Sequence, residues 1–240
     1  MQSQRQQSDL RNLHDEQYII MQPIKKADLP RIIVDYALDI ASRQNWSDTS
    51  LEEIADQSGL TLEDLKKTYP SKNSIVAAYT TRVDECVLNS ITSEYKFNSK
   101  SGRDRLFVVL IKRFEIMNTN KHAIKSIFRS YTSDLEALAR GPLSLYRSMR
   151  WMLEAANISY AGGKGQVRIK GLSLIYLSVL RTWFKDDGDN MRDTIEKLDS
   201  QLYRAERILG FLRLNNNNSQ STDTINILKD SRNKMEPDSV

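Results

Sequence analysis

Residues 49–79 combine side chains whose types and spacing fit contact with DNA. Thr49 and Ser50 stand before an apolar i, i+3, i+4 spacing, with glutamates three residues on, which predicts a capped helix. Gly59 follows where a sharp turn needs a positive φ, and Thr61 then caps a second short helix. Two such helices around a tight turn read base edges in the major groove. The second one is the predicted recognition helix.

The charge of this region leaves two interpretations open. Glu63 and Asp64 lie near the start of the recognition helix, where base-reading side chains enter the groove. Carboxylates repel phosphate but can accept a hydrogen bond from cytosine N4. Alternatively, both acids stabilise the helix N-terminus and point away from DNA. Residues 28–80 hold five Lys or Arg against nine Asp or Glu, whereas a DNA-binding domain is normally basic.

Flanking patterns complete a two-domain, all-α organisation. Asp28 is predicted to cap a helix with Pro30 in its first turn, and Ser71 to cap a longer helix after the pair. Later periodic stretches, separated by breakers such as Gly141-Pro142, predict helices over 103–118, 121–139, 143–156, 166–185 and 191–213. We expect a three-helix helix-turn-helix domain, a helical bundle for ligand binding and dimerisation, and two disordered polar tails. Their ranges are 28–80, 81–214, 1–27 and 215–240.

Composition restricts the class of protein. The 240 residues are 40% hydrophobic, without an apolar run of the roughly 18 to 20 residues that span a membrane. The first 27 residues lack the hydrophobic core of a signal peptide, so we expect a cytoplasmic protein. Residues 96–150 hold twelve Lys or Arg against four acids, which suits either a solvated face or contact with anionic lipid.

No residue set predicts catalysis, a cofactor or a metal. The glycine-rich residues 161–165 lack P-loop spacing and follow a predicted helix rather than a strand. Residues 186–189 lack the ligand pattern of a calcium loop, and a helix end with a cap explains them. Two histidines and one cysteine, Cys86, assemble neither a catalytic triad nor a closed zinc site. We therefore predict that the protein is not an enzyme.

The order of these motifs resembles the N-terminal domain of TetR-family transcriptional regulators. The resemblance covers roughly residues 28–79 and rests on Trp46, Ile54-Ala55, Gly59-Leu60-Thr61, Leu65 and Tyr69-Pro-Ser-Lys72. Motifs in the second half resemble a TetR-like branch that includes lipid-binding proteins of ubiquinone biosynthesis. Those motifs begin at Arg103, Arg150 and Trp183.

The resemblance implies a sequence-specific transcriptional regulator, a ligand-responsive repressor that binds a near-palindromic double-stranded operator as a homodimer. The alternative is a lipid- or quinone-binding accessory protein of ubiquinone biosynthesis without specific DNA binding. The implied DNA contacts are Thr61, Glu63, Lys66, Lys67, Thr68, Tyr69 and Lys72. Family members contact phosphates at the positions that Lys66, Thr68 and Lys72 hold in this sequence.

The resemblance also implies an effector site and a dimer interface in the second domain. A small apolar or lipid-like effector would contact Phe114, Phe128, Tyr131, Trp151, Met152 and Tyr176. The last two long helices would pair in a four-helix bundle through apolar stripes. The stripes are Leu172, Ile175, Val179, Thr182 and Trp183 on one helix and Ile195, Leu198, Leu202, Ile208 and Leu212 on the other.

Overall fold

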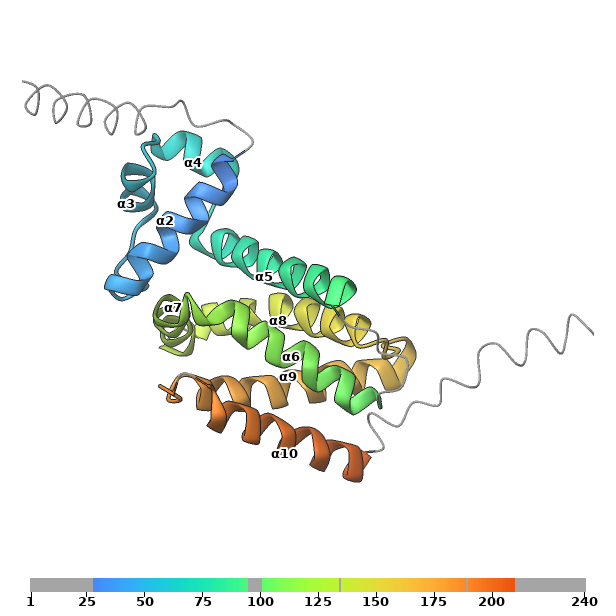
Figure 1. Ribbon diagram of the computed structural model, residues 1–240. Coiled ribbons are helices and arrows are strands. Elements are labelled where there is room, and N and C mark those ends of the chain that lie inside the picture. The colour runs from blue at the N-terminus through green and yellow to red at the C-terminus, as the bar shows by residue number, and fades with distance from the viewer. Residues whose placement is uncertain (1–27, 95–100, 134, 189, 210–240) are drawn as a thin grey trace, which may run out of the picture. The chain divides into compact units, whose positions relative to one another are not determined.

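The computed structural model describes residues 28–94, 101–133, 135–188 and 190–209, and every regular element in this part of the chain is an α-helix (Figure 1). The predicted all-α fold is therefore confirmed, while the predicted tails fall outside the described ranges. The helices are α2 (Leu29–Arg43), α3 (Leu51–Gln57), α4 (Leu62–Thr68), α5 (Lys72–Glu94), α6 (Gly102–Asn118), α7 (Lys121–Ser133), α8 (Leu135–Ala155), α9 (Gly162–Trp183) and α10 (Arg192–Leu209).

The chain divides into two compact units. Of the described residues, unit 1 contains 28–79 together with 122–130 of α7, and unit 2 contains the others. Consequently α5 passes from one unit to the other, and most of α7 belongs with the N-terminal helices.

Unit 1 is built on the apolar faces of α2, α3 and α4. Ile33, Ile54 and Leu65 are each 0% exposed, and Ala37 and Ala55 are 1% exposed. The alanines allow α2 to pack closely on α3, while α3 packs on α4. These buried contacts hold the two short helices in place, because isolated seven-residue helices are not stable in water.

The predicted cap at the start of α2 is wrong. Asp28 occupies the N-cap position, but its backbone is helical (φ −90°, ψ −12°) and its side chain makes no capping hydrogen bond. A capping side chain needs an extended backbone to reach the amides of the first turn. Pro30 does lie in that turn, as predicted.

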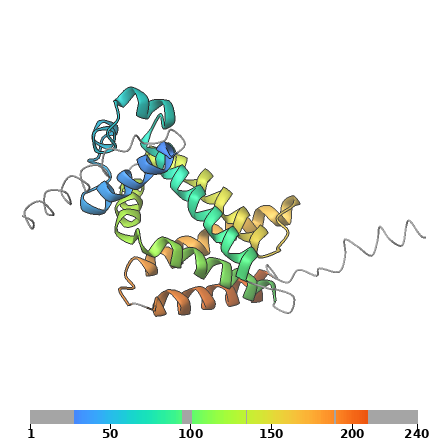
Figure 2. The ribbon, with the colours of Figure 1, turned by 45° about the horizontal axis from the view of Figure 1, so that its top comes forward.

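Unit 2 packs α9 against both α8 and α10, with α6 contacting α8 and α10 (Figure 2). Its core contains fully buried large side chains from each of these four helices. They include Leu106, Phe114, Met149, Met152, Leu172, Trp183, Leu198 and Leu202. The burial of Leu172, Val179 and Trp183 overturns their prediction as a free dimerisation stripe, since α9 already uses that face within one chain.

Two predicted helix ends in unit 2 are also wrong. α7 ends at Ser133 rather than near residue 139, and α8 begins at Leu135 and continues through Gly141 and Pro142. Glycine and proline lower helix stability without fixing where a helix ends. The packing of Met149, Met152 and Leu153 in the core stabilises α8 against that cost.

The glycine-rich segment before α9 has a packing role. A Cβ on Gly165 would lie 1.8 Å from the carbonyl oxygen of Tyr160, so only glycine fits there. Gly162 has a φ of +65°, which glycine adopts without strain. The close backbone approach at Gly165 and the positive φ at Gly162 account for these two glycines, so no phosphate ligand is needed to explain them.

Candidate nucleic-acid interface

The helix-turn-helix is closed by the side-chain caps that its sequence predicts. Ser50 Oγ accepts a hydrogen bond from the Glu53 amide at 3.0 Å, and Thr61 Oγ1 accepts one from the Asp64 amide at 3.2 Å. Gly59 has a φ of +67°, as predicted for the turn. The Leu60 amide donates to the Ala55 carbonyl at 2.9 Å, which closes that turn. The orientation of α4 is thereby fixed by local hydrogen bonds.

α4 buries one side and exposes the other. Leu65 is fully buried, while Glu63, Asp64, Lys66 and Lys67 are exposed. Five predicted contact residues therefore lie on this one short helix or at its cap, and Tyr69 and Lys72 follow at its end and at the start of α5. All seven thus lie within residues 61–72 of the chain.

Lys67 is neutralised within its own helix. Its Nζ lies 3.0 Å from Asp64 Oδ1 and 3.1 Å from Glu63 Oε1. The hydrogen bonds to Asp64 and then Glu63 raise the pKa of Lys67. The i, i+3 and i, i+4 spacings could have shown this network, because such pairs meet on a helix surface. Both acids thus turn toward a lysine of the protein.

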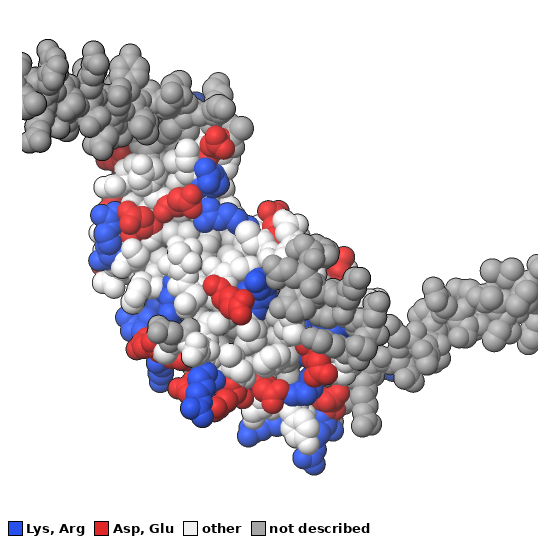
Figure 3. All heavy atoms as spheres, in the orientation of Figure 1, with Lys and Arg blue, Asp and Glu red and all other residues white. Residues whose placement is uncertain are grey.

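Lys66 differs from its neighbour. It is exposed, and it forms no ion pair with any residue in the described ranges. It is therefore the cation of α4 most available to a phosphate. On the face drawn in Figure 3, Lys and Arg atoms are interspersed with Asp and Glu atoms.

Lys72 has an internal role that sequence reasoning missed. Its Nζ donates to the carbonyl oxygens of Trp46 at 2.5 Å and Thr49 at 2.6 Å. The ammonium also lies 5.0 Å from the centre of the Trp46 ring. Burial lowers the pKa of Lys72, against the opposite influence of Asp48 and Glu53. The lysine thus fastens the start of α5 to the loop that precedes α3.

Tyr69 forms a second link of this kind. Its hydroxyl donates to the Pro30 carbonyl at 3.3 Å, so the end of α4 is joined to the first turn of α2. Thr68 is half-buried at the end of α4, where its hydroxyl faces the Asp64 carbonyl at 3.5 Å. These residues position the recognition helix.

The predicted effector residues lie mainly in the core of unit 2. Phe114, Met152 and Tyr176 are buried, and the rings of Phe114 and Tyr176 stack with centres 5.3 Å apart. Trp151 and Tyr131 are half-buried, and burial raises the pKa of Tyr131. Phe128 belongs instead to the part of α7 in unit 1.

Beside Tyr176 lies a buried polar cluster that the apolar pattern did not predict. Arg113 NH1 pairs with Asp84, and Arg113 Nε donates to the Tyr176 hydroxyl at 3.1 Å. Ser148 donates to the second Asp84 oxygen at 2.6 Å. Asp84 and Ser148 are 0% exposed and Arg113 is 4% exposed. Because the buried charges of Asp84 and Arg113 are paired and hydrogen-bonded, the free-energy cost of burying them is reduced.

Comparison with solved structures identifies the fold as that of TetR-family transcriptional regulators. A TetR regulator from Nitrosomonas europaea has a TM-score of 0.60 and 20% identity, over 75% of this chain and 98% of that one. A TetR regulator from a Rhodococcus species has a TM-score of 0.55 and 13% identity, over 77% and 100%. One from Streptomyces coelicolor has a TM-score of 0.50 and 12% identity, over 88% and 100%.

No family model and no curated protein matches the sequence. The structural likeness therefore defines the fold, and the residues above supply the case for a function. Among the described residues, none of the helices is long and apolar enough to cross a bilayer, and no three His, Cys, Asp or Glu are grouped to hold a metal.

Proposed function

We propose that this chain is a sequence-specific DNA-binding transcriptional regulator of TetR type, and not an enzyme. The observation that carries the proposal is the fixed presentation of α4: Leu65 is fully buried beneath it, Gly59 makes the turn before it, and Lys66 is exposed on it. Such a helix can enter the major groove while its cations contact flanking phosphates.

The regulator would act as a homodimer. On α9, Val167 is 55% exposed and Leu174 is 71% exposed, seven residues apart and therefore on one side of the helix. On α10, Tyr203 is 49% exposed. Pairing of α9 and α10 with a second copy would cover these side chains. Two-fold symmetry would then favour a near-palindromic operator with half-sites about 34 Å apart.

Lys66 supplies the test of DNA contact. In anisotropy titrations with duplexes enriched from a random library, Lys66→Ala should weaken binding to every sequence and reduce the salt slope by about one. Lys67→Ala is the matched control and should have a smaller effect, because Glu63 and Asp64 already neutralise that lysine. Equal, negligible effects of both changes would contradict the proposed interface.

We further propose that a small apolar or lipid-like effector binds unit 2 and shifts the population away from the DNA-competent state, making the protein a ligand-responsive repressor. The half-buried rings of Trp151 and Tyr131 are its most accessible predicted contacts. Trp151→Ala should reduce the thermal shift caused by an apolar ligand while leaving DNA affinity without ligand unchanged. Loss of both the ligand-induced thermal shift and the DNA affinity would indicate a general folding defect and contradict an effector role for Trp151.

A second candidate function is a lipid- or quinone-binding accessory protein that keeps the helix-turn-helix as a scaffold. The internal use of Lys67 and Lys72 favours it, since two of the three cations between residues 66 and 72 already have partners in the protein. Uniformly weak, salt-sensitive binding to all duplexes, together with saturable binding of a quinone, would support this candidate.

A further inference from the structure

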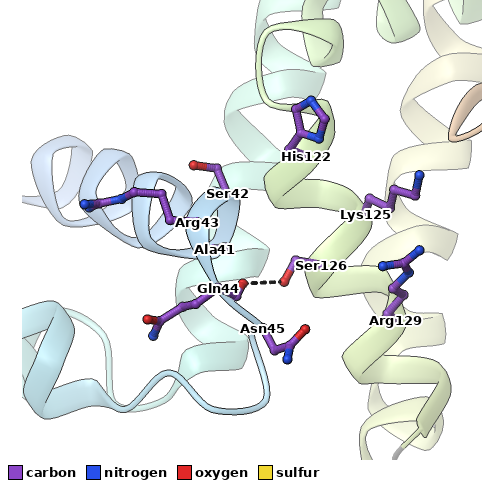
Figure 4. A pocket seen from close by; sticks show the side chains of 9 residues that line it. All are labelled: Ala41, Ser42, Arg43, Gln44, Asn45, His122, Lys125, Ser126 and Arg129. Atoms are coloured by element: carbon purple, nitrogen blue, oxygen red, sulfur yellow. Dashed lines mark hydrogen bonds between the residues drawn. The ribbon is translucent and has the colours of Figure 1, made fainter. Parts of the chain in front are cut away.

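The end of α2 and one face of α7 border an open basic hollow within unit 1 (Figure 4). Its volume of about 390 Å³ falls within the range of small-molecule sites. It is lined by Ala41, Ser42, Arg43, Gln44, Asn45, His122, Lys125, Ser126 and Arg129. None of these nine residues is a carboxylate, which makes the lining suited to an anion.

α7 contributes the basic side chains from a single face. His122, Lys125 and Arg129 are separated by three and four residues, a spacing that places them side by side on a helix. The thirteen residues from Lys121 to Ser133 include no Asp or Glu. Lys125 and Arg129 carry like charges at an i, i+4 spacing, and both also interact elsewhere in the chain.

The opposite wall is held in place by hydrogen bonds. Ser126 Oγ donates to the Gln44 carbonyl and accepts from the Trp46 amide, both at 2.9 Å. In Figure 4 the guanidinium of Arg43 points away from α7, and it pairs with Asp39. Lys125 and Arg129 are therefore the main anion-binding groups, and Asn45 and Ser42 offer polar contacts to the rest of a ligand.

The hollow lies at the end of α2 opposite to Tyr69, but Lys72 contacts the carbonyl of Trp46, one residue beyond the lining residue Asn45. Tyr69, at the end of α4, touches Pro30 at the N-terminal end of α2, whereas the hollow is formed by residues 41–45 at the other end. The fifteen residues of α2 span about 22 Å at 1.5 Å per residue. None of the nine lining residues belongs to α4.

We propose that this hollow binds a small molecule that carries a phosphate monoester. Arg129 would hold the phosphate through paired N–H donors and Lys125 through its point charge. The volume leaves room for the organic part of the ligand beside Asn45 and Ser42. The proposal does not depend on DNA binding and is tested without DNA.

The test is calorimetric titration of the full chain with three phosphomonoesters: adenosine monophosphate, glucose 6-phosphate and glycerol 3-phosphate. We expect saturable binding of at least one ester, at least tenfold tighter than inorganic phosphate and lost with the dephosphorylated compound. Arg129→Gln and Lys125→Gln should each weaken it about tenfold or more, as loss of a charge-assisted hydrogen bond does. Lys170→Gln, an exposed residue of α9 with the same charge change, is the matched control and should have no effect.

Three results would overturn the proposal. They are the absence of saturable binding by any of the three esters, inorganic phosphate binding as tightly as the best ester, and an equal loss with Lys170→Gln. Arg129 is exposed, so its variant should retain the native melting curve and remain informative even where Lys125→Gln unfolds the protein.

Discussion

At the scale of single residues, three nearby lysines have three different roles. Lys66 is exposed on α4, Lys67 pairs with Glu63 and Asp64, and Lys72 binds the carbonyls of the loop before α3. The family resemblance implied DNA contact for all three. The predicted helices placed Lys66 and Lys67 on the recognition helix and Lys72 after it. The hydrogen-bond partners of Lys72 lie 23 to 26 residues away in the sequence, so local spacing could not predict them.

The buried Asp84–Arg113 pair should be a major stabilising contact of unit 2. Asp84→Asn would leave the Arg113 charge buried without its partner, and such a loss costs about 3–5 kcal/mol. Urea denaturation would measure the change in free energy of unfolding. Tyr176→Phe removes only a hydroxyl and should cost about 1–3 kcal/mol. An Asp84→Asn variant within about 1 kcal/mol of the wild type would contradict the buried pair, because even an ordinary hydrogen bond contributes about that much.

Asp186 should make stability depend on acidic pH. Burial alone would raise its pKa, but hydrogen bonds from Thr194 and Gly188 and the charge of Lys121 hold the pKa below its ordinary value of 3.8. A carboxyl with a depressed folded pKa stabilises the fold above its unfolded pKa and loses that contribution as pH falls through the folded pKa. Wild-type melting temperature should therefore fall below about pH 4.

The matched comparison for this pH dependence is between neighbouring aspartates. Asp186→Asn should flatten the fall in melting temperature between about pH 5 and pH 2, because its titration is removed. Asp187→Asn should not, since that side chain is 93% exposed. Identical acid profiles for the two variants would exclude Asp186 as the titrating group.

At the scale of elements, the start of a helix was predicted accurately where a side chain caps that helix. α3, α4 and α6 begin within one residue of the predicted positions, because Ser50, Thr61 and Ser101 cap them as hydrogen-bond acceptors. The boundary between α7 and α8 was misplaced, because tertiary packing carries α8 through Gly141-Pro142. The basic hollow also escaped prediction, since it joins segments about 80 residues apart.

The turn between α3 and α4 should favour glycine at residue 59. Gly59 has a φ of +67°, and a Cβ added there would have no other atom within 4 Å. Gly59→Ala therefore carries a purely conformational cost of about 1–2 kcal/mol. Thermal melting and duplex affinity should both decrease. Gly163→Ala, which also has open space but lies in α9 without a positive φ, should be neutral or stabilising. A Gly59→Ala variant that melted at the wild-type temperature would show that the positive φ is not needed to hold α4 in its fixed orientation.

At the scale of the whole molecule, the proposed homodimer depends on apolar residues that one chain leaves uncovered. Leu174→Glu places a charge on the most exposed large hydrophobic side chain of the described residues, which would be costly in an apolar interface. Analytical ultracentrifugation should show a dimer for the wild type at micromolar concentration and a shift toward monomer for the variant.

Cys86→Glu is the control for this change, because Cys86 is exposed on α5 and lies outside the proposed interface. It should remain dimeric. A wild-type monomer, or a Leu174→Glu variant that stays fully dimeric, would contradict pairing through α9.

The most direct test of the central claim is selection of bound duplexes from a random library, followed by titration of the enriched sequence at several salt concentrations. A DNA-binding regulator predicts a near-palindromic sequence, bound as a dimer far more tightly than scrambled duplex, with a steep salt slope. Absence of enrichment, with equal weak binding to enriched and scrambled duplexes, would contradict sequence-specific regulation and favour the lipid- or quinone-binding function.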